Sequence, residues 1–440
     1  MNGRSRVELF LVMVLVCQLA LLVPAMGPYR MVLRMASFGM SVAMLAATFG
    51  REATPHPAAK PLLAVLAVAG LSLLHPSTNG WLSGGAQLFL YAAIAGPLFW
   101  VCRMRVDGET LRLTLAVLWL FHLTSSGLAL VQVKYPGEFQ PRISAVILAQ
   151  GDEYLRDLHF RNAAGDLVLR PMGLTDIPGG ASLSGFYAVL GGIGAMLGAS
   201  NFWLRAAGAG ALPLGMAAIY FSQTRSVLVM LVASLAALMA ILAWRRQAGR
   251  LAFAAGAGAA ALSFAWAVSI GGDAIENRFS SLWSEGAADI VYKGRGRFLE
   301  ETILDLIPKY PFGAGMGRWG MPFAYLGDST DPSRGALWAE IQWSGWLYDG
   351  GVPMIVVYTL AILTAAWIAA RVAAKAQGEL AVWAAVIVAY DAGAIAVLFG
   401  YPLFAGQSGM EFWLLNGVLF AATLETQRSA ARDWMEGRTT

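Results

Sequence analysis

The sequence predicts an all-α polytopic membrane protein with about twelve transmembrane helices. Of its 440 residues, 58% are hydrophobic and only 13% are charged, which is far from the composition of soluble proteins. Apolar runs of spanning length also recur along nearly the whole chain. Lipid offers no partner to an open backbone group, so each run is expected to be helical. We therefore expect one transmembrane domain over residues 1–440.

The apolar runs give the expected positions of the spans. They lie near residues 7–25, 31–49, 61–74, 86–102, 111–132, 183–200, 203–221, 226–243, 251–269, 352–370, 379–399 and 410–425.

The distribution of basic residues predicts the orientation of these spans. If the N-terminus is cytoplasmic, sixteen Lys and Arg residues fall in the cytoplasmic segments, including the pair Arg103 and Arg105. The short loops on the other side then hold only Arg30, Arg34 and Arg225. This asymmetry follows the positive-inside rule, so both termini are expected in the cytoplasm.

Two long polar segments, residues 133–182 and 270–350, then fall on the outer side, and we expect short amphipathic helices in them. Apolar residues at helical spacing predict one such helix from Phe298 to Tyr310, ended by Pro308 and Pro311. We expect the second segment to be the catalytic region. Further on, Gly350, Gly351 and Pro353 interrupt a long apolar run and predict an outer helix followed by a spanning helix. Glu340 is expected on that outer helix.

Several classes of function are disfavoured by composition. The net charge of +4 is small and its cationic residues are dispersed, which gives no sign of a nucleic-acid surface. The two cysteines, Cys17 and Cys102, lie in apolar runs, and the four histidines are scattered. Neither set has the spacing of metal ligands, so we expect no metal and no cofactor.

Arg225 is the most informative single residue. It lies among hydroxyl side chains in the segment from Ser222 to Ser226, at the outer start of a span. A helix N-terminus with a guanidinium forms an anion site, whereas the alternative is an arginine that only anchors the helix at the interface. We favour anion binding.

The second outer segment combines cations with glycines. Arg295, Arg297 and Arg318 accompany the glycine-rich run Gly313 to Gly320. This combination suits a phosphate group, but a tight loop folded over the bundle explains the glycines equally well. The aromatic residues of this region, Trp338 among them, suit either stacking against sugar rings or an interfacial belt.

Three segments, in order, resemble the O-antigen ligase and polymerase superfamily of membrane glycosyltransferases. Arg170 to Pro178 resembles its Arg-x-x-Gly segment with a following proline, although Gly179 stands where asparagine is common. Ser222 to Ser226 resembles its Ser-Arg segment. Gly294 to Gly317 resembles its Gly-Arg, amphipathic helix, Pro and Gly-x-Gly sequence, with Arg295 or Arg297 as the arginine. The likeness covers about residues 170–355.

The resemblance also implies roles for individual residues. Ligases of the family have a His-Asn pair about eleven residues before a glycine that opens a span, and Glu340-Ile341 stands at that distance from Gly351. The absent histidine favours a polymerase, since related peptidoglycan polymerases use a carboxylate near this place. Glu340 would then be the catalytic base, and the alternative is a salt bridge to Arg334 or Arg318. The substrate-binding candidates are Arg170, Arg225, Arg295, Arg297 and Arg318.

The expected function is polymerisation of undecaprenyl-pyrophosphate-linked oligosaccharide repeat units by metal-independent, inverting transfer, as in O-antigen or exopolysaccharide synthesis. The implied partners are the lipid-linked donor, a glycan acceptor, membrane lipids and a chain-length regulator. The implied location is the bacterial inner membrane, with a periplasmic site. An O-antigen ligase that acts on lipid A-core and a lipid-linked glycan flippase are the alternatives, but few ionisable residues in the spans argue against a flippase.

Overall fold

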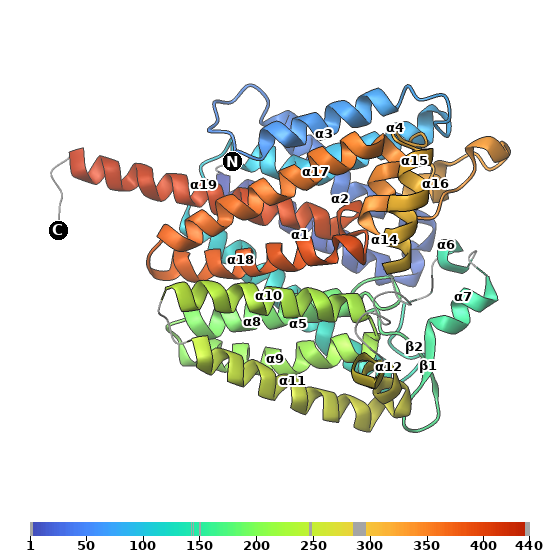
Figure 1. The fold of residues 1–440 in the computed structure, drawn as a ribbon. Helices are drawn as coiled ribbons and strands as arrows, with labels where there is room; N and C mark the ends of the chain where they lie inside the picture. The colour runs from blue at the N-terminus through green and yellow to red at the C-terminus, as the bar shows by residue number, and fades with distance from the viewer. Residues whose placement is uncertain are drawn as a thin grey trace.

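The computed structural model describes residues 3–141, 143, 145–148, 151–245, 249–284 and 296–435. Over these ranges the chain is a bundle of long, roughly parallel and antiparallel helices, with one small sheet (Figure 1). The predicted class, an all-α polytopic membrane protein, is confirmed in its broad form.

The long helices follow the expected spans closely. They are α1 (Gly3–Leu22), α2 (Arg30–Ala47), α3 (Ala59–Ser72), α4 (Gly80–Val101), α5 (Gly108–Lys134), α8 (Ala181–Gly198), α9 (Phe202–Ser222), α10 (Arg225–Trp244), α11 (Gly249–Gly271), α17 (Gln342–Lys375), α18 (Gly378–Ala396) and α19 (Gln407–Met435).

Within the described residues, nine helices are long and apolar enough to cross a membrane. They are α1, α2 with the preceding 3-10 turn η1 (Pro24–Tyr29), α4, α5, α8, α9, α10, α17, and α18 with the following turn η5 (Val397–Phe399). The other three expected spans coincide with α3, which is 14 residues long, α11 and α19. A total of about twelve spans therefore stays a prediction.

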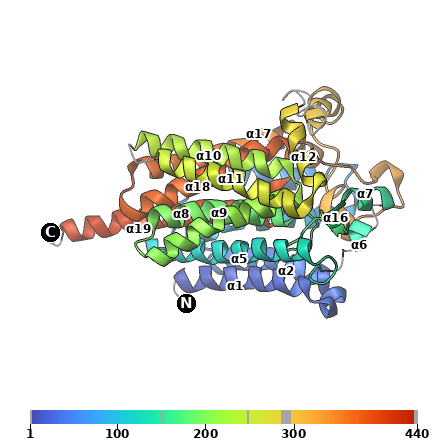
Figure 2. The ribbon, with the colours of Figure 1, turned by 90° about the horizontal axis from the view of Figure 1, so that it is seen from below.

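The two long segments lie at one end of the bundle, here called the loop end. The start of α1 and the end of α19 lie at the opposite end, here called the termini end (Figure 2). The first segment holds α6 (Ala145–Leu148), α7 (Asp152–Asp157), β1 (His159–Arg161) and β2 (Leu167–Leu169). The second holds α12 (Asp273–Ser284), α14 (Arg297–Glu301), the π-helical turn η3 (Thr302–Leu306), α15 (Ile307–Lys309), α16 (Gly320–Leu326) and the 3-10 turn η4 (Pro332–Arg334).

The short helices predicted in these segments are present, with two differences in detail. The first segment contains an antiparallel hairpin as well as short helices, because β1 pairs with β2 around a turn that Gly165 makes at positive φ. In the second segment the helix predicted from Phe298 to Tyr310 is present as α14, η3 and α15, but Pro308 lies in its last turn and does not end it, since helical backbone continues to Lys309. A proline cannot donate to a carbonyl in the preceding turn, and the helix widens there: the Ile307 N–H bonds to the Thr302 oxygen five residues back.

Helices α8 and α9 approach each other closely because their contact is made by glycines. A β-carbon on Gly185 would overlap the carbonyl oxygen of Gly215, and one on Gly208 would lie 2.6 Å from the oxygen of Gly192. Small residues allow such backbone contact, which is the usual means of packing helices in a medium without a hydrophobic driving force. Among the described residues, α8 and α9 accordingly make the most extensive contact between two helices.

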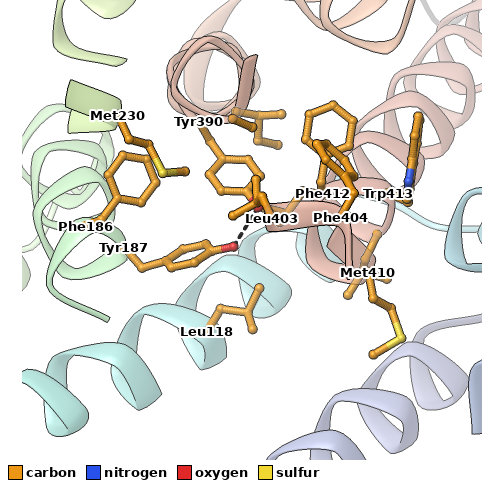
Figure 3. Close-up of a cluster of buried hydrophobic side chains, with 14 of the residues drawn as sticks. Leu118, Phe186, Tyr187, Met230, Tyr390, Leu403, Phe404, Met410, Phe412 and Trp413 are labelled. Carbon is orange, nitrogen blue, oxygen red and sulfur yellow. Dashed lines mark hydrogen bonds between the residues drawn. The ribbon is translucent and has the colours of Figure 1, made fainter. Parts of the chain in front are cut away.

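Large aromatic side chains fill the space between α8, α18 and α19. Phe186, Tyr390, Phe404 and Phe412 are buried there, and the Tyr187 hydroxyl donates to the Tyr390 hydroxyl at 2.8 Å (Figure 3). The Tyr390 hydroxyl donates in turn to a backbone carbonyl, that of Ser408, at 3.0 Å. Buried tyrosines need such partners, and this chain of bonds ties α8 to α18 and to the start of α19.

The predicted interruption of the apolar run after Trp338 is confirmed inside α17. Gly350 and Gly351 leave helical geometry, and Gly351 has a φ of +66°. In an unbroken helix the Val352 N–H would bond to the oxygen of Tyr348, four residues earlier. Instead, Val352 donates to Pro311 O at 2.9 Å, and Tyr348 O accepts from the Ala314 N–H at 2.8 Å. The break therefore exchanges one helical hydrogen bond for two others, one to Pro311 just before the glycine-rich loop and one to Ala314 within it.

We predict that Gly351→Ala destabilises the protein far more than Gly50→Ala. Both glycines have positive φ, but a β-carbon at 351 would overlap Pro311 O, whereas nothing lies within 4 Å of one at 50. The strain common to both costs about 1–2 kcal/mol, and the overlap adds to it only at 351. The measurement is apparent Tm in detergent. Equal shifts for the two variants would contradict the packing of the loop against the break.

Candidate functional site at the loop end

The glycine-rich loop from Gly313 to Gly320 is held between the break in α17 and the start of α4. The Asn79 N–H donates to Met316 O at 3.0 Å, and the Met316 N–H donates to the Thr78 hydroxyl at 3.2 Å. The Ser83 hydroxyl donates to Gly317 O at 2.6 Å. These bonds use the loop's own backbone groups, so the arrangement favours the tight-loop interpretation of its glycines over a phosphate cradle.

A buried carboxylate stabilises the same loop. Asp349, the last residue before the break, accepts three hydrogen bonds on one oxygen, Oδ2. The donors are Gln87 Nε2 at 2.9 Å, the Tyr91 hydroxyl at 2.6 Å and the indole of Trp319 at 2.8 Å. Three elements, α4, the loop and α17, therefore meet at one side chain.

Arg318, which the sequence predicted to bind substrate, lies inside the loop region and bonds to backbone carbonyls on either side of it. It is 8% exposed, and its guanidinium donates to the carbonyl oxygens of Ala314 at 2.9 Å and Gly335 at 3.0 Å. The Leu337 N–H returns a bond to Arg318 O at 2.7 Å. Arg318 thus joins the glycine-rich loop to the segment that leads to Glu340. This role is structural.

Glu340 lies just before α17 and not on a helix, which corrects the sequence-based expectation. The helix begins at Gln342, whose side-chain oxygen accepts the Phe404 N–H at 2.7 Å and so fixes this end of α17 to the turn before α19. Glu340 itself is partly exposed and accepts a hydrogen bond from the indole of Trp338 at 2.8 Å. The Trp338 ring is 57% exposed, and it leaves an aromatic face beside the carboxylate.

The two arginines considered as salt-bridge partners of Glu340 have other contacts. Arg318 donates to backbone carbonyls, and Arg334 Nε lies 3.5 Å from Asp331 Oδ2. These contacts favour an interpretation of Glu340 other than a salt bridge to either arginine.

Three other carboxylates at the loop end are less suited to accept a proton from a substrate. Asp176 is buried in an ion pair with Arg34. Asp349 is fully buried under three donors. At Asp328 hydrogen bonds from the hydroxyl and the N–H of Thr330 lower the pKa of the carboxyl, which makes it a weaker base. Among these four carboxylates, Glu340 combines exposure with an adjacent aromatic face.

The segments that carry the family resemblance lie near one another at the loop end. Gly179, just after the first segment, lies against the second: a β-carbon there would be 3.4 Å from the Thr224 hydroxyl. Asp176, in the first segment, pairs with Arg34 of α2, and Arg34 also contacts the sulfur of Met321 in α16, beside the glycine-rich loop. Arg34 therefore links the first segment to Met321, four residues beyond the third segment.

The turn between α18 and α19 links the second segment with the region of Glu340. Gly400 packs against Ser226 at the start of α10, and the ring of Phe399 lies 4.9 Å from that of Trp343 in the first turn of α17. Residues far apart in the sequence, near 176, 225, 320 and 340, are therefore assembled around one region.

Three of the remaining predicted arginines have described positions. Arg225 is the first residue of α10 and is partly exposed, as the sequence indicated. Arg297 begins α14, is exposed, and lies 5.4 Å from the ring of Phe298. Arg170 is half-buried, its Nε has no hydrogen-bond partner among the described residues, and burial lowers its pKa below the ordinary value of an arginine. Arg295 lies outside the described residues, so the choice between Arg295 and Arg297 stays open.

Nothing in the described ranges suggests a metal centre. No three His, Cys, Asp or Glu side chains gather there in an arrangement that could hold a metal ion.

Sequence reasoning missed the inner supports of this region. Gln87 and Tyr91 are polar residues four apart in an otherwise apolar span, and this spacing places both on one helix face, a signal that could have predicted a buried polar partner such as Asp349. The pair of Arg34 with Asp176 has no such local signal, because it joins residues 142 positions apart.

Comparison with known proteins adds no relative: no protein-family model matches the chain, and no curated protein matches it.

Proposed function

We propose that the chain is a membrane glycosyltransferase that polymerises oligosaccharide repeat units linked to undecaprenyl pyrophosphate. The observation that supports this most is the proximity of the three segments that resemble the O-antigen ligase and polymerase superfamily. They are separated in sequence, yet Asp176, Thr224 and Met321 are connected through Arg34 and Gly179 at the loop end. A shared site explains why such segments would be brought together.

In this proposal the arginines bind the pyrophosphate of the donor. Arg225 begins α10, where free N–H groups and the helix dipole also favour an anion. Arg297 begins a second, shorter helix and is exposed, so its guanidinium is accessible to a ligand. Arg170 and Arg295 are further candidates. Fixed cations stabilise the negative charge that develops on the pyrophosphate as it leaves, so the reaction needs no metal ion.

Glu340 is the proposed general base. A hydroxyl oxygen of the acceptor sugar attacks the anomeric carbon of the donor, and its proton passes to the Glu340 carboxylate. The bond from that carbon to the pyrophosphate oxygen breaks, and its electron pair leaves with undecaprenyl pyrophosphate. Attack from the opposite face inverts the anomeric configuration. The exposed ring of Trp338, bonded to Glu340, offers a face on which a sugar can stack.

A glutamate in place of the ligase histidine favours polymerisation over transfer to lipid A-core. The acceptor is then a second lipid-linked glycan, and a chain-length regulator is an expected partner.

We also propose that the termini end faces the bacterial cytoplasm and the loop end the periplasm. In a background with Cys17 and Cys102 replaced by alanine, Ser333→Cys at the exposed loop end should react with a membrane-impermeant thiol reagent in intact spheroplasts. Ala430→Cys, exposed at the termini end, should react only after lysis. The reverse pattern would contradict the orientation derived from the basic residues.

Arg225→Lys should reduce transfer by roughly 10- to 100-fold while the protein still inserts and folds. A lysine keeps the charge but cannot form the two-pronged bond of a guanidinium to a phosphate, and a hydrogen bond to a charged group is worth about 1.5–3 kcal/mol. The measurement is the transfer rate of purified protein, with Arg161→Lys, an exposed residue of β1, as the matched control. Equal rates for both variants would make Arg225 an interfacial anchor.

Glu340→Gln should lower single-turnover transfer by roughly 100-fold or more, because glutamine keeps the size of the side chain but cannot accept the proton. Donor binding should be largely retained. Glu153→Gln, an exposed acid of α7, is the control and should be unaffected. If Glu340→Gln lowers thermal stability but leaves the rate per folded molecule unchanged, Glu340 is structural and the proposed base is wrong.

A further inference from the structure

A cavity of about 390 Å³ lies between α5, α8 and α18, away from the loop end. Its opening is at the termini end, where Arg4, Glu109, Arg112 and Glu379 line it. Its other end is closed by Tyr187, Tyr390 and neighbouring apolar residues. We call it the termini-side cavity. Its volume falls within the ~300–1,000 Å³ range of small-molecule sites.

The depth of this cavity matches one leaflet of a bilayer. On α18 its lining runs from Glu379 to Tyr390, and on α8 from Gly198 to Tyr187. Each is a step of eleven positions, or about 16 Å at 1.5 Å per helical residue. The hydrocarbon core is about 30 Å thick, so the cavity extends from one surface to about the midplane.

The walls of the cavity are apolar, because the indole N–H groups of the two tryptophans that line it are bonded to the protein. The indole of Trp119 donates to Ala188 O at 3.1 Å, and that of Trp383 donates to Glu379 Oε1 at 3.0 Å. Both N–H groups are used by the protein, so the rings can present carbon surface to the space. At the closed end the Tyr187 and Tyr390 hydroxyls are satisfied by each other and by a backbone carbonyl. These four side chains therefore need no water in the cavity.

The opening carries balanced charge. Arg4 Nη1 lies 2.9 Å from Glu109, and Arg112 Nη1 lies 3.6 Å from Glu379. Side chains of both pairs are substantially exposed, so they can rearrange around a ligand. Two cations beside two anions match a headgroup that contains both a phosphate and an ammonium group.

From the depth, the apolar walls and the charged opening we infer that the termini-side cavity binds one acyl chain of a zwitterionic phospholipid from the adjacent leaflet. The phosphate contacts the arginines of the opening and the ammonium contacts its glutamates. Since the cavity and the glycan site lie at opposite ends of the bundle, this lipid is not the proposed donor. Absence of this lipid from the cavity would therefore not bear on the proposed function, and absence of glycan transfer would not bear on the lipid.

Photo-crosslinking tests the inference. The protein is reconstituted in vesicles that contain a trace of phosphatidylethanolamine with a diazirine in the distal half of one acyl chain, and adducts are mapped by peptide mass spectrometry. Leu118 and Leu190 line the cavity and are each only 3% exposed, so annular lipid does not reach them. We expect adducts on the peptides that contain these two residues. Wild-type protein without such adducts would overturn the inference.

Filling the cavity should remove these adducts. Ala195 lines it and is buried, and Ala195→Phe should reduce the adducts by about fivefold or more because close-packed walls leave no second path for the chain. Ala116→Phe, at an exposed position of the α5 wall of the cavity, should act alike if Ala195→Phe does not fold. Ala236→Phe, exposed on α10, is the control and should change nothing. Unchanged adducts in folded Ala195→Phe or Ala116→Phe would contradict the inference.

The headgroup contact has its own test. Arg112→Ala should reduce crosslinking of the phosphatidylethanolamine probe by about two- to fivefold, as expected for an exposed ion pair, but should leave a diacylglycerol probe unaffected. Equal effects on both probes would show that Arg112 does not contact the lipid phosphate.

Ala195→Cys, in a background without Cys17 and Cys102, should resist a hydrophilic thiol reagent in vesicles. Ready modification would mean that water fills the cavity, and the inference would be wrong.

Discussion

The exchange of hydrogen bonds at the break in α17 is the constraint on which the loop end depends. A spanning helix satisfies its own backbone, and an open carbonyl or N–H near the hydrocarbon costs several kcal/mol. Because Gly350 and Gly351 interrupt α17, Tyr348 O and the Val352 N–H do not bond to each other. Tyr348 O instead accepts from Ala314, and the Val352 N–H donates to Pro311. The glycine-rich loop is therefore required where it is, because it completes the helix.

The position of the candidate base follows from that exchange. The loop is fixed in two places. In α17 it bonds to the break and to Asp349, and near the start of α4 it bonds to Thr78, Asn79 and Ser83. Arg318 then fixes the segment before Glu340, since it bonds the loop to Gly335 and Leu337, a few residues before Glu340. A rigid support of this kind is what a site requires to orient a base against a substrate.

Much of the fold could be predicted from the sequence because hydropathy and glycine act locally. Apolar runs located the long helices, and Gly350, Gly351 and Pro353 located the break in α17. The helix predicted from Phe298 to Tyr310 is likewise present, although Pro308 lies in its last turn, where the helix widens and continues to Lys309.

The candidate site was predictable only as a set of residue types. The sequence placed Arg225 at a helix start, which the structure bears out. It placed Glu340 on a helix and grouped Arg318 with the phosphate ligands, because nothing in the sequence shows that Gln342 bonds to Phe404 or that Arg318 bonds to carbonyls in its own loop. Such contacts come from tertiary packing, and so does the pair of Arg34 with Asp176.

The central question is whether the assembled loop end transfers glycan. The most direct measurement incubates the purified protein in detergent with radiolabelled undecaprenyl-pyrophosphate-linked repeat units, without added metal and with chelator present, and separates the products by size. We expect a ladder of longer lipid-linked glycans with release of undecaprenyl pyrophosphate in proportion. Labelled units that stay at their original length with folded protein, under conditions in which they bind, would contradict it.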